Sequence, residues 1–127
     1  MENERIFLKC EHCGNIVGLI EDAGVSVVCC GEKMKRLMPN TVDASKEKHL
    51  PVLSVENGKL HVEVGSLPHP MTPEHHIAWI AVAQKNRTQR VALDVNGEPK
   101  ADFCIDEGPV TVYAYCNLHG LWVSELK

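Results

Sequence analysis

Four cysteines near the start of the chain have a spacing that can hold one metal ion. Cys10 and Cys13 form a Cys-x-x-Cys pair, and Cys29 and Cys30 follow as an adjacent pair. Four thiolates complete a tetrahedron that suits zinc or iron and leaves no open position. The pattern predicts a closed site that supports structure or carries single electrons, and spacing alone favours structural zinc. His12 lies inside the first pair, but the shell is already full, so we expect it to face solvent.

A second group of metal-binding residue types lies in segments that read as loops. Cys116 and His119 form a Cys-x-x-His pair, and His49, His69 and His75 each lie within two residues of a proline. A rigid scaffold commonly presents ligands from such loops. One histidine alone is more often a surface residue, but the chain has seven. We therefore interpret these five residues together as a second metal site.

Three further residues of these types are interpreted as lying outside both sites. His61 falls on the polar face of a predicted strand, so we expect it to be solvated. His76 neighbours His75 and should point the other way. Cys104 alternates with Phe103 and Ile105, and we expect it to be a small packing residue.

Iron and copper compete for the second site on spacing alone. A Cys-x-x-His loop on a β-sandwich is also typical of blue-copper proteins, which add a long axial methionine. No methionine follows Cys116 in the sequence, so copper comes second. A non-haem iron oxygenase commonly uses two histidines and one carboxylate, which does not match. The main rival class is a non-enzymatic iron or blue-copper-like electron-transfer protein, or a zinc-stapled binding module.

Short strands must position the second group of residues. Residues 53–55 lead to Asn57-Gly58, a strong hairpin signal, and residues 59–64 alternate apolar with polar side chains. Further apolar runs predict strands at Ile77–Val82, Val91–Leu93, Ala101–Ile105, Val110–Tyr115 and Leu121–Val123. About seven short strands indicate an all-β, antiparallel sandwich of the immunoglobulin-like kind. The one helical candidate is a turn or two near residues 44–48.

The first stretch of the chain is a different kind of unit. It is rich in glycine and cysteine, with short apolar runs at residues 6–8, 16–20 and 25–28. Such runs do not build a core, and a unit of fewer than about 40 residues usually needs a staple. We therefore predict a four-cysteine metal module at residues 1–38 and a β-sandwich domain at residues 39–127.

Charge and hydropathy exclude several function classes. The net charge of −4 offers no basic footprint for nucleic acid or an anionic membrane. No segment approaches the roughly 20 apolar residues of a membrane span, and the start of the chain does not read as a secretory signal. We expect a cytoplasmic protein without a nucleic-acid or membrane partner, where reduced thiols favour metal ligation over disulfides.

These residues resemble the desulfoferrodoxin family. The Cys-x-x-Cys and Cys-Cys pairs look like the desulforedoxin module of that family. Five later segments are also similar: Asn40–Asp43, Glu47–Val52, His69–Met71, His75–Trp79 and Tyr115–Gly120. The resemblance covers essentially the whole chain and includes the order of the ligands. Because all four module cysteines are present, the match is to the two-iron form.

The resemblance implies a superoxide reductase with two non-haem irons. Centre I would have the ligands Cys10, Cys13, Cys29 and Cys30. Centre II would be a ferrous iron with His49, His69, His75 and His119 in a plane, Cys116 as axial ligand and an open sixth position. The implied reaction is the one-electron reduction of superoxide to hydrogen peroxide without release of oxygen. A homodimer and an electron donor such as a rubredoxin-like protein are also implied.

Two charged residues beside His49 are interpreted as catalytic. Four neutral imidazoles and one thiolate leave ferrous iron with a formal charge of +1, which attracts an anion. Lys48 adds a local positive charge, and such a charge can raise encounter rates about 10-fold or more at low salt. Glu47 is then placed to occupy the vacant position of the oxidised iron as a carboxylate.

Overall fold

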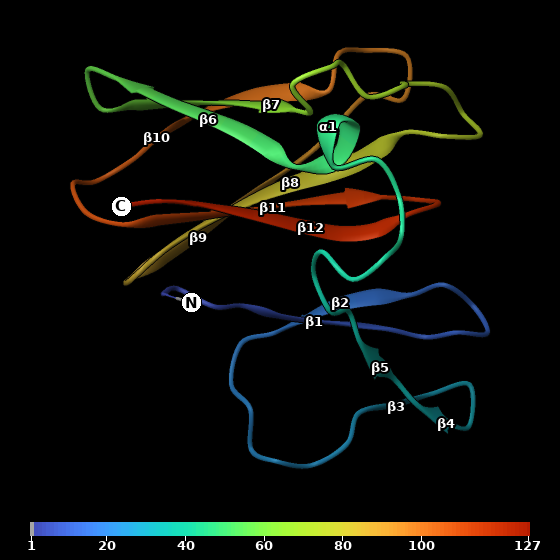
Figure 1. Cartoon of the computed structure of the whole chain (residues 1–127). Coiled ribbons are helices and arrows are strands. Elements are labelled where there is room, and N and C mark those ends of the chain that lie inside the picture. The colour runs from blue at the N-terminus through green and yellow to red at the C-terminus, as the bar shows by residue number, and fades with distance from the viewer. Residues whose placement is uncertain (1) are drawn as a thin grey trace. The chain divides into compact units, whose positions relative to one another are not determined.

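The computed structural model describes residues 2–127, which divide into two compact units. The smaller unit is Glu4–Met38, and the larger is Pro39–Lys127 together with the described residues before Glu4. Figure 1 draws the smaller unit in blue to teal, and the larger unit continues from green to red. Among the described residues, no helix is long and apolar enough to cross a membrane.

The small unit contains short strands and little apolar core. Its three-stranded sheet has the order β2-β1-β5, with β1 at Ile6–Lys9, β2 at Ile16–Leu19 and β5 at Lys35–Arg36. A two-stranded ribbon pairs β3 (Val28–Cys29) with β4 (Glu32–Lys33). The predicted run at residues 25–28 enters a strand only at Val28, and Val25 is exposed. Phe7 and Leu8 are the large apolar side chains buried here, so metal ligation must supply much of the stability.

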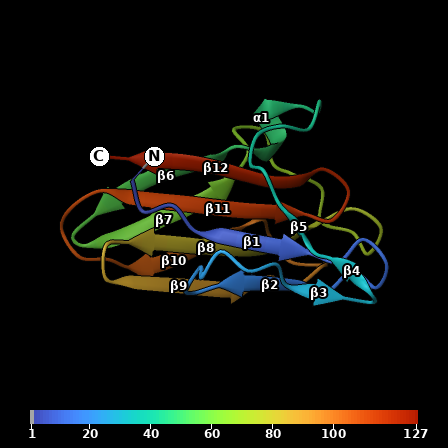
Figure 2. The same cartoon turned by 90° about the horizontal axis from the view of Figure 1, so that it is seen from below.

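The large unit is the predicted antiparallel sandwich of seven strands. They are β6 (Pro51–Glu56), β7 (Lys59–Val64), β8 (Ile77–Gln84), β9 (Arg87–Ala92), β10 (Lys100–Cys104), β11 (Val110–Cys116) and β12 (Gly120–Leu126). One sheet has the order β10-β7-β6 and the other has the order β12-β11-β8-β9. Figure 2 shows β11 lying between β12 and β8, as one of the two inner strands of its sheet.

The hairpin between β6 and β7 forms as its turn residues predict. Asn57 and Gly58 have φ values of 50° and 75°, the positive pair that a type I′ turn requires. Glu56 pairs with Lys59, and the register then continues along both strands. This register directs Leu60, which is fully buried, toward the core.

The core of the sandwich extends to one of the predicted metal ligands. Apolar side chains from the inner faces of both sheets form one cluster, to which Leu60, Val62, Val64, Ile77, Ile80, Val82, Phe103, Val110, Val112, Ala114 and Cys116 belong. Along β11, Val112, Ala114 and Cys116 alternate toward this interior. The last residue of β11, Cys116, therefore places its thiol where the core meets the loops at one end of the sandwich.

A β-bulge at the start of β8 changes the direction in which the residues before Ile77 leave the sheet. Tyr115 pairs with Trp79, but the next residue, Cys116, pairs with Ile77, so Ala78 is an extra residue on β8. A bulge of this kind reverses the alternation of side chains. Ile77 therefore points into the core, and the preceding residues meet the loop that follows Cys116.

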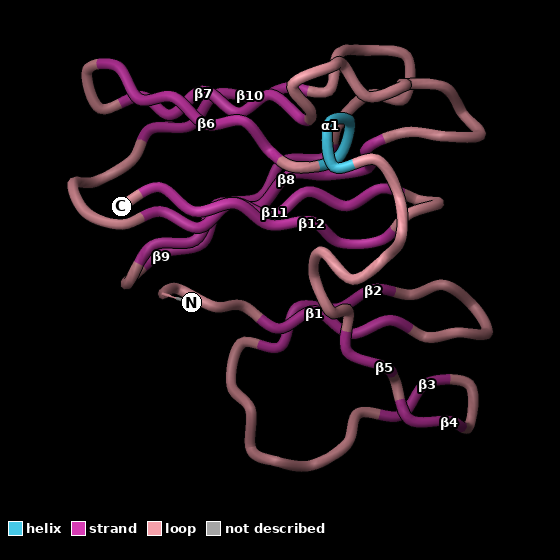
Figure 3. Tube along the Cα trace, viewed as in Figure 1, coloured by secondary structure: helices cyan, strands magenta, loops and turns pink. Residues whose placement is uncertain are grey.

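The predicted helical turn is present as α1, Lys46–His49. Figure 3 shows it in cyan, the one helix among the described residues. It is a single turn, closed by the Leu50 N–H donating to the Lys46 carbonyl at 3.0 Å. The turn leaves Glu47 and Lys48 exposed and buries His49.

Candidate metal centres

The four cysteines of the small unit lie together, as their spacing predicts. Their sulfur atoms are all within 4.8 Å of one another, and all four are free thiols. The Sγ atoms of Cys13 and Cys29 are 3.6 Å apart. A tetrahedral ion with bonds of about 2.3 Å separates its sulfur ligands by roughly 3.8 Å. The arrangement therefore fits a closed four-thiolate metal site.

The electrostatics of these thiols also point to a bound cation. The backbone N–H of Cys13, 3.5 Å from the Cys10 sulfur, is the main cause that lowers the pKa of Cys10 to about 6. Hydrogen bonding with the thiols of Cys13 and Cys10 raises the pKa of Cys30 to about 12. Protein groups alone thus do not let all four sulfurs ionise together. A metal ion supplies the positive charge that does.

His12 lies outside this site, as expected. Its side chain is exposed, and its Nε2 is 2.9 Å from a carboxylate oxygen of Glu32. The prediction that His12 faces solvent is confirmed, and the structure adds its acidic partner.

Four histidine rings at one end of the sandwich form a closed cycle. The ring centroids are 4.6 Å apart for His49 and His69, and 4.6 Å for His69 and His75. They are 5.0 Å apart for His75 and His119, and 4.8 Å for His119 and His49. Neighbouring rings are nearly perpendicular, at 73° to 86°. Across the cycle, His49 and His75 are 6.3 Å apart, so the rings occupy the corners of an approximate square.

The hydrogen bonds of two of these rings determine where their lone pairs lie. His49 Nδ1 is 2.6 Å from the Ser45 carbonyl, and His69 Nδ1 is 2.7 Å from the Pro70 carbonyl. A carbonyl only accepts, so each Nδ1 carries the proton and each Nε2 of the neutral ring carries a lone pair. The two Nε2 atoms are 3.1 Å apart. Two lone pairs facing each other at this distance repel unless a cation lies between them.

The distances between nitrogens match a metal ion with its ligands at right angles. His49 Nε2 is also 3.0 Å from His119 Nδ1. With metal–nitrogen bonds of about 2.1 Å, ligands at right angles are roughly 3.0 Å apart and tetrahedral ligands roughly 3.4 Å. His75 Nε2 is buried without any hydrogen-bond partner. A buried polar atom without a partner is costly, and a metal bond would satisfy it.

Cys116 adds a sulfur donor to the imidazole cycle. Its Sγ lies within 4.8 Å of the ligand atoms of His49, His75 and His119, and 3.9 Å from His119 Nδ1. His69 is outside that group and joins the cycle through its 3.1 Å contact with His49 Nε2. The side chain is fully buried, and this burial raises the pKa of the thiol. The His119 backbone N–H lies 3.4 Å from the sulfur and opposes that shift. A bound metal ion would complete the ionisation, since a coordinating thiol is deprotonated outright.

Burial favours the neutral, metal-binding form of His49, His69 and His75. Desolvation lowers the pKa of His69 to about 4 and also lowers the pKa values of His49 and His75. The charge of Lys48 contributes to the lower pKa of His49 and of His75. Lys48 and Glu47 are exposed on α1 beside His49.

Two residues that were not singled out in the sequence pack against the segments that carry the histidines. Trp122 stacks on His49 with centroids 4.9 Å apart and an interplanar angle of 24°. Its indole N–H donates to the His119 carbonyl at 3.1 Å. Gly65 lies against α1, where an added Cβ would be 2.8 Å from the Glu47 carbonyl oxygen and would clash with the carbonyl oxygen of Leu67.

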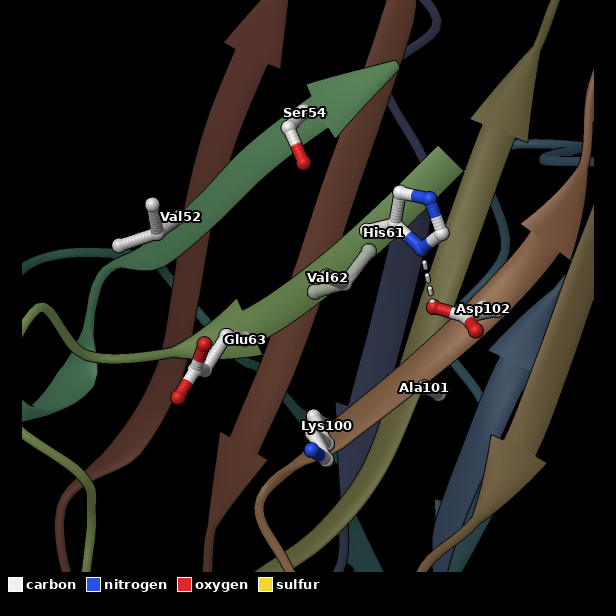
Figure 4. A pocket seen from close by; sticks show the side chains of 8 residues that line it. All are labelled: Val52, Ser54, His61, Val62, Glu63, Lys100, Ala101 and Asp102. Atoms are coloured by element: carbon white, nitrogen blue, oxygen red, sulfur yellow. Dashed lines mark hydrogen bonds and ion pairs between the residues drawn. The ribbon is translucent and has the colours of Figure 1, made fainter. Parts of the chain in front are cut away.

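The remaining histidines and the sixth cysteine lie outside the cycle. His76 Nδ1 donates to the Thr72 carbonyl at 2.9 Å, so it points away from the cycle as expected. His61 lies on the outer face of β7, where its Nδ1 is 2.7 Å from Asp102 (Figure 4). The prediction that Cys104 packs in the core is wrong. Phe103 takes the inward direction on β10, which leaves Cys104 exposed on the other face.

The fold and the two donor sets define a class of small metalloprotein. It has a four-thiol site in one unit and a site of four imidazoles and one thiol at the end of a β-sandwich.

Known proteins of this class match the chain over most of its length. A family model described as desulfoferrodoxin matches residues 41–125, and one described as the desulfoferrodoxin N-terminal domain matches residues 2–37. A desulfoferrodoxin of Syntrophotalea carbinolica is 47% identical over 117 residues, which cover 92% of this chain and 93% of the relative. The chain therefore belongs to the desulfoferrodoxin family, and its two donor sets fit two iron centres.

Solved structures agree with this assignment. The superoxide reductase from Treponema pallidum matches with a TM-score of 0.78 and 38% identity, covering 95% of this chain and 98% of its own. A superoxide reductase from Giardia intestinalis, described as 1Fe-SOR, matches with a TM-score of 0.55 and 27% identity. It covers 65% of this chain and 99% of its own.

We predict that Gly65→Ala destabilises the sandwich by about 2–5 kcal/mol, because it combines a positive φ of 86° with a clash against the backbone of α1. The matched control is Gly58→Ala, since Gly58 has a φ of 75° and open space around it. The control should cost only about 1–2 kcal/mol. Urea unfolding followed by circular dichroism measures the free energy of unfolding of both variants. Equal losses of stability would contradict the clash between an added Cβ at Gly65 and the backbone of α1.

We predict that the iron-free protein loses stability as the pH falls from about 6.5 to about 4. Burial lowers the pKa of His69 from its ordinary value of 6.5 to about 4, so the unfolded chain binds more protons in this range. The contribution is complete above pH 6.5 and is lost toward pH 4. Urea unfolding across this range measures the slope, which His69→Asn should flatten. If the free energy of unfolding depended on pH equally in the parent protein and in His69→Asn, the lowered pKa of His69 would not be its cause.

Proposed function

We propose that this chain is a superoxide reductase, which reduces superoxide to hydrogen peroxide at the site of four imidazoles and one thiol. The observation that carries the proposal is the square cycle of four rings with the buried Cys116 sulfur beside it. These five protein donors would hold an iron ion, which would supply the reducing electron to a small ligand bound beside them. The superoxide reductases among the matched structures support the choice of substrate.

A bound ferrous iron supplies the electron, and with two protons this electron converts one superoxide to one hydrogen peroxide. The protein's own residues prepare the site. The carbonyls of Ser45 and Pro70 hold the rings of His49 and His69 with their lone pairs turned inward. Burial keeps these imidazoles neutral. The core around Cys116 excludes water from the sulfur.

We assign Lys48 and Glu47 as the residues that handle the substrate. Both side chains are exposed on the turn that carries His49. The ammonium group of Lys48 attracts the superoxide anion and holds it near the site. The carboxylate of Glu47 would be available to occupy the site after hydrogen peroxide has left. The exposure of both groups supports roles that need contact with solvent.

The rival reading as an electron carrier alone is not favoured. A carrier works best with a closed site, and the thiols of the small unit already provide one. We propose that this four-cysteine site is a separate iron module at residues 1–38, and that residues 39–127 form the reductase domain. The family matches at residues 2–37 and 41–125 support the division.

We further propose that the protein acts in the cytoplasm as a homodimer and takes part in electron transport. Its donor would be a small redox protein such as a rubredoxin-like protein. Six free thiols support a reducing compartment. The net charge of −4 supports a protein donor over a nucleic-acid or membrane partner.

We predict that the pre-reduced, iron-loaded protein yields one hydrogen peroxide and no oxygen for each superoxide consumed. A known pulse of superoxide, with parallel assays of peroxide and oxygen, measures this ratio. Half as much peroxide together with oxygen would mean a dismutase. No acceleration over buffer would return the protein to the electron-carrier class.

We predict that Lys48→Ala slows the capture of superoxide about 10-fold at low salt and flattens its dependence on ionic strength, because the anion loses electrostatic attraction. Lys46→Ala is the matched control, since it removes the same charge from the same turn. Pulse radiolysis at several salt concentrations measures both rates. Equal rates and equal salt slopes in the two variants would remove the steering role of Lys48.

A further inference from the structure

Asn117 directly follows Cys116 at the end of β11 and binds the loop that carries His75. Its side-chain Oδ1 accepts a hydrogen bond of 2.9 Å from the His76 backbone N–H. Its Nδ2 donates to the Glu74 carbonyl at 2.9 Å. Its own backbone N–H donates to the His76 carbonyl at 3.2 Å. Asn117 therefore binds the backbone on both sides of His75, and both ends of its amide are used.

His75 depends on its backbone more than two other histidines of the cycle do. The rings of His49 and His69 are each held by a carbonyl through Nδ1. Among the described residues no protein group hydrogen-bonds the His75 ring, and its Nε2 is buried without a partner. The direction of this ring is therefore set by the path of the main chain from Glu74 to His76.

That main-chain path has two supports. One is internal: Thr72 and His75 exchange backbone hydrogen bonds of 3.0 and 3.2 Å, which shape the loop but tie it only to itself. The other is Asn117, which joins the loop to the end of β11 and extends the pairing of β8 and β11 beyond Ile77 and Cys116. This second support joins the segment around His75 directly to the residue after Cys116, in addition to the strand pairing of Ile77 with Cys116.

We propose that Asn117 is a positioning residue that sets His75 relative to Cys116 and so determines how firmly the iron is held. The proposal rests on the function proposed above, since it assigns a residue to the same centre. Groups that orient metal ligands from outside the first shell commonly change metal affinity by roughly 10- to 100-fold.

The test compares two variants of Asn117 with a matched control. Asn117→Asp keeps the shape and the acceptor for the His76 N–H, but it turns a carboxylate oxygen toward the Glu74 carbonyl. Asn117→Ala removes both side-chain bonds. The control is Asn40→Asp, because Asn40 makes the same pair of bonds to a backbone, with the N–H and the carbonyl of Val123 at 2.9 and 3.2 Å. Asn40 lies outside the imidazole cycle.

The readouts are the rate of ferrous-iron release from the reduced full-length protein to a chelator and the sulfur-to-iron charge-transfer absorption of the oxidised protein. Both Asn117 variants should release iron from the imidazole–thiol centre roughly 10- to 100-fold faster, and their absorption band should shift. Asn40→Asp should keep the band and release iron within about 2-fold of the parent. Urea unfolding confirms that each variant is folded.

Unchanged release and an unchanged band in Asn117→Asp would overturn the proposal, as would equal effects of Asn117→Asp and Asn40→Asp. If Asn117→Ala does not fold, the nearly isosteric Asn117→Asp decides alone. These outcomes are independent of the superoxide assay. A parent protein that fails to reduce superoxide refutes the proposed function, whereas the iron-release comparison tests the positioning role by itself.

Discussion

The repulsion between facing lone pairs is the constraint on which the rest of the sandwich depends. His49 Nε2 and His69 Nε2 lie 3.1 Å apart, and the carbonyls of Ser45 and Pro70 prevent either nitrogen from carrying a proton in the neutral ring. Burial opposes the alternative of charging the rings. The free energy of folding must therefore hold these nitrogens together until a cation binds. Metal binding and folding are coupled wherever ligands are gathered in this way.

The two donor sets meet this constraint by different means. In the small unit, a thiol such as Cys30, whose pKa is raised, can keep its proton when no metal is bound. That set needs little apolar support. The facing nitrogens of the imidazole set cannot relieve their repulsion by taking up protons. They are instead held in place by the large core that reaches Cys116 and by Trp122, which stacks on His49. A module of short strands is therefore enough for one site, whereas the other needs a complete sandwich.

Much of this arrangement could be predicted from the sequence, because the ligands are chemically distinctive residues. The Asn57-Gly58 turn was equally readable, since few other pairs accept two positive φ values. Cys104 was misread although the alternation along β10 was available in the sequence. Ala101, Phe103 and the following Ile105 share one face, and Cys104 shares the other face with the exposed Asp102. Asn117 and Gly65 gave no local signal. Their partners, at Glu74 to His76 and at Glu47, come near only through the tertiary fold.

The order of the ligands along the chain has a consequence for synthesis on the ribosome. The thiol set is complete once Cys30 has been made, and its ligands are joined by short loops that close quickly. The imidazole set draws on residues from His49 to His119 and on a sheet in which the inner strand β11 is made late. A nascent chain can therefore fill its first site long before the second exists. The thiol site would therefore become able to bind iron first, and the imidazole site only after the sandwich is complete.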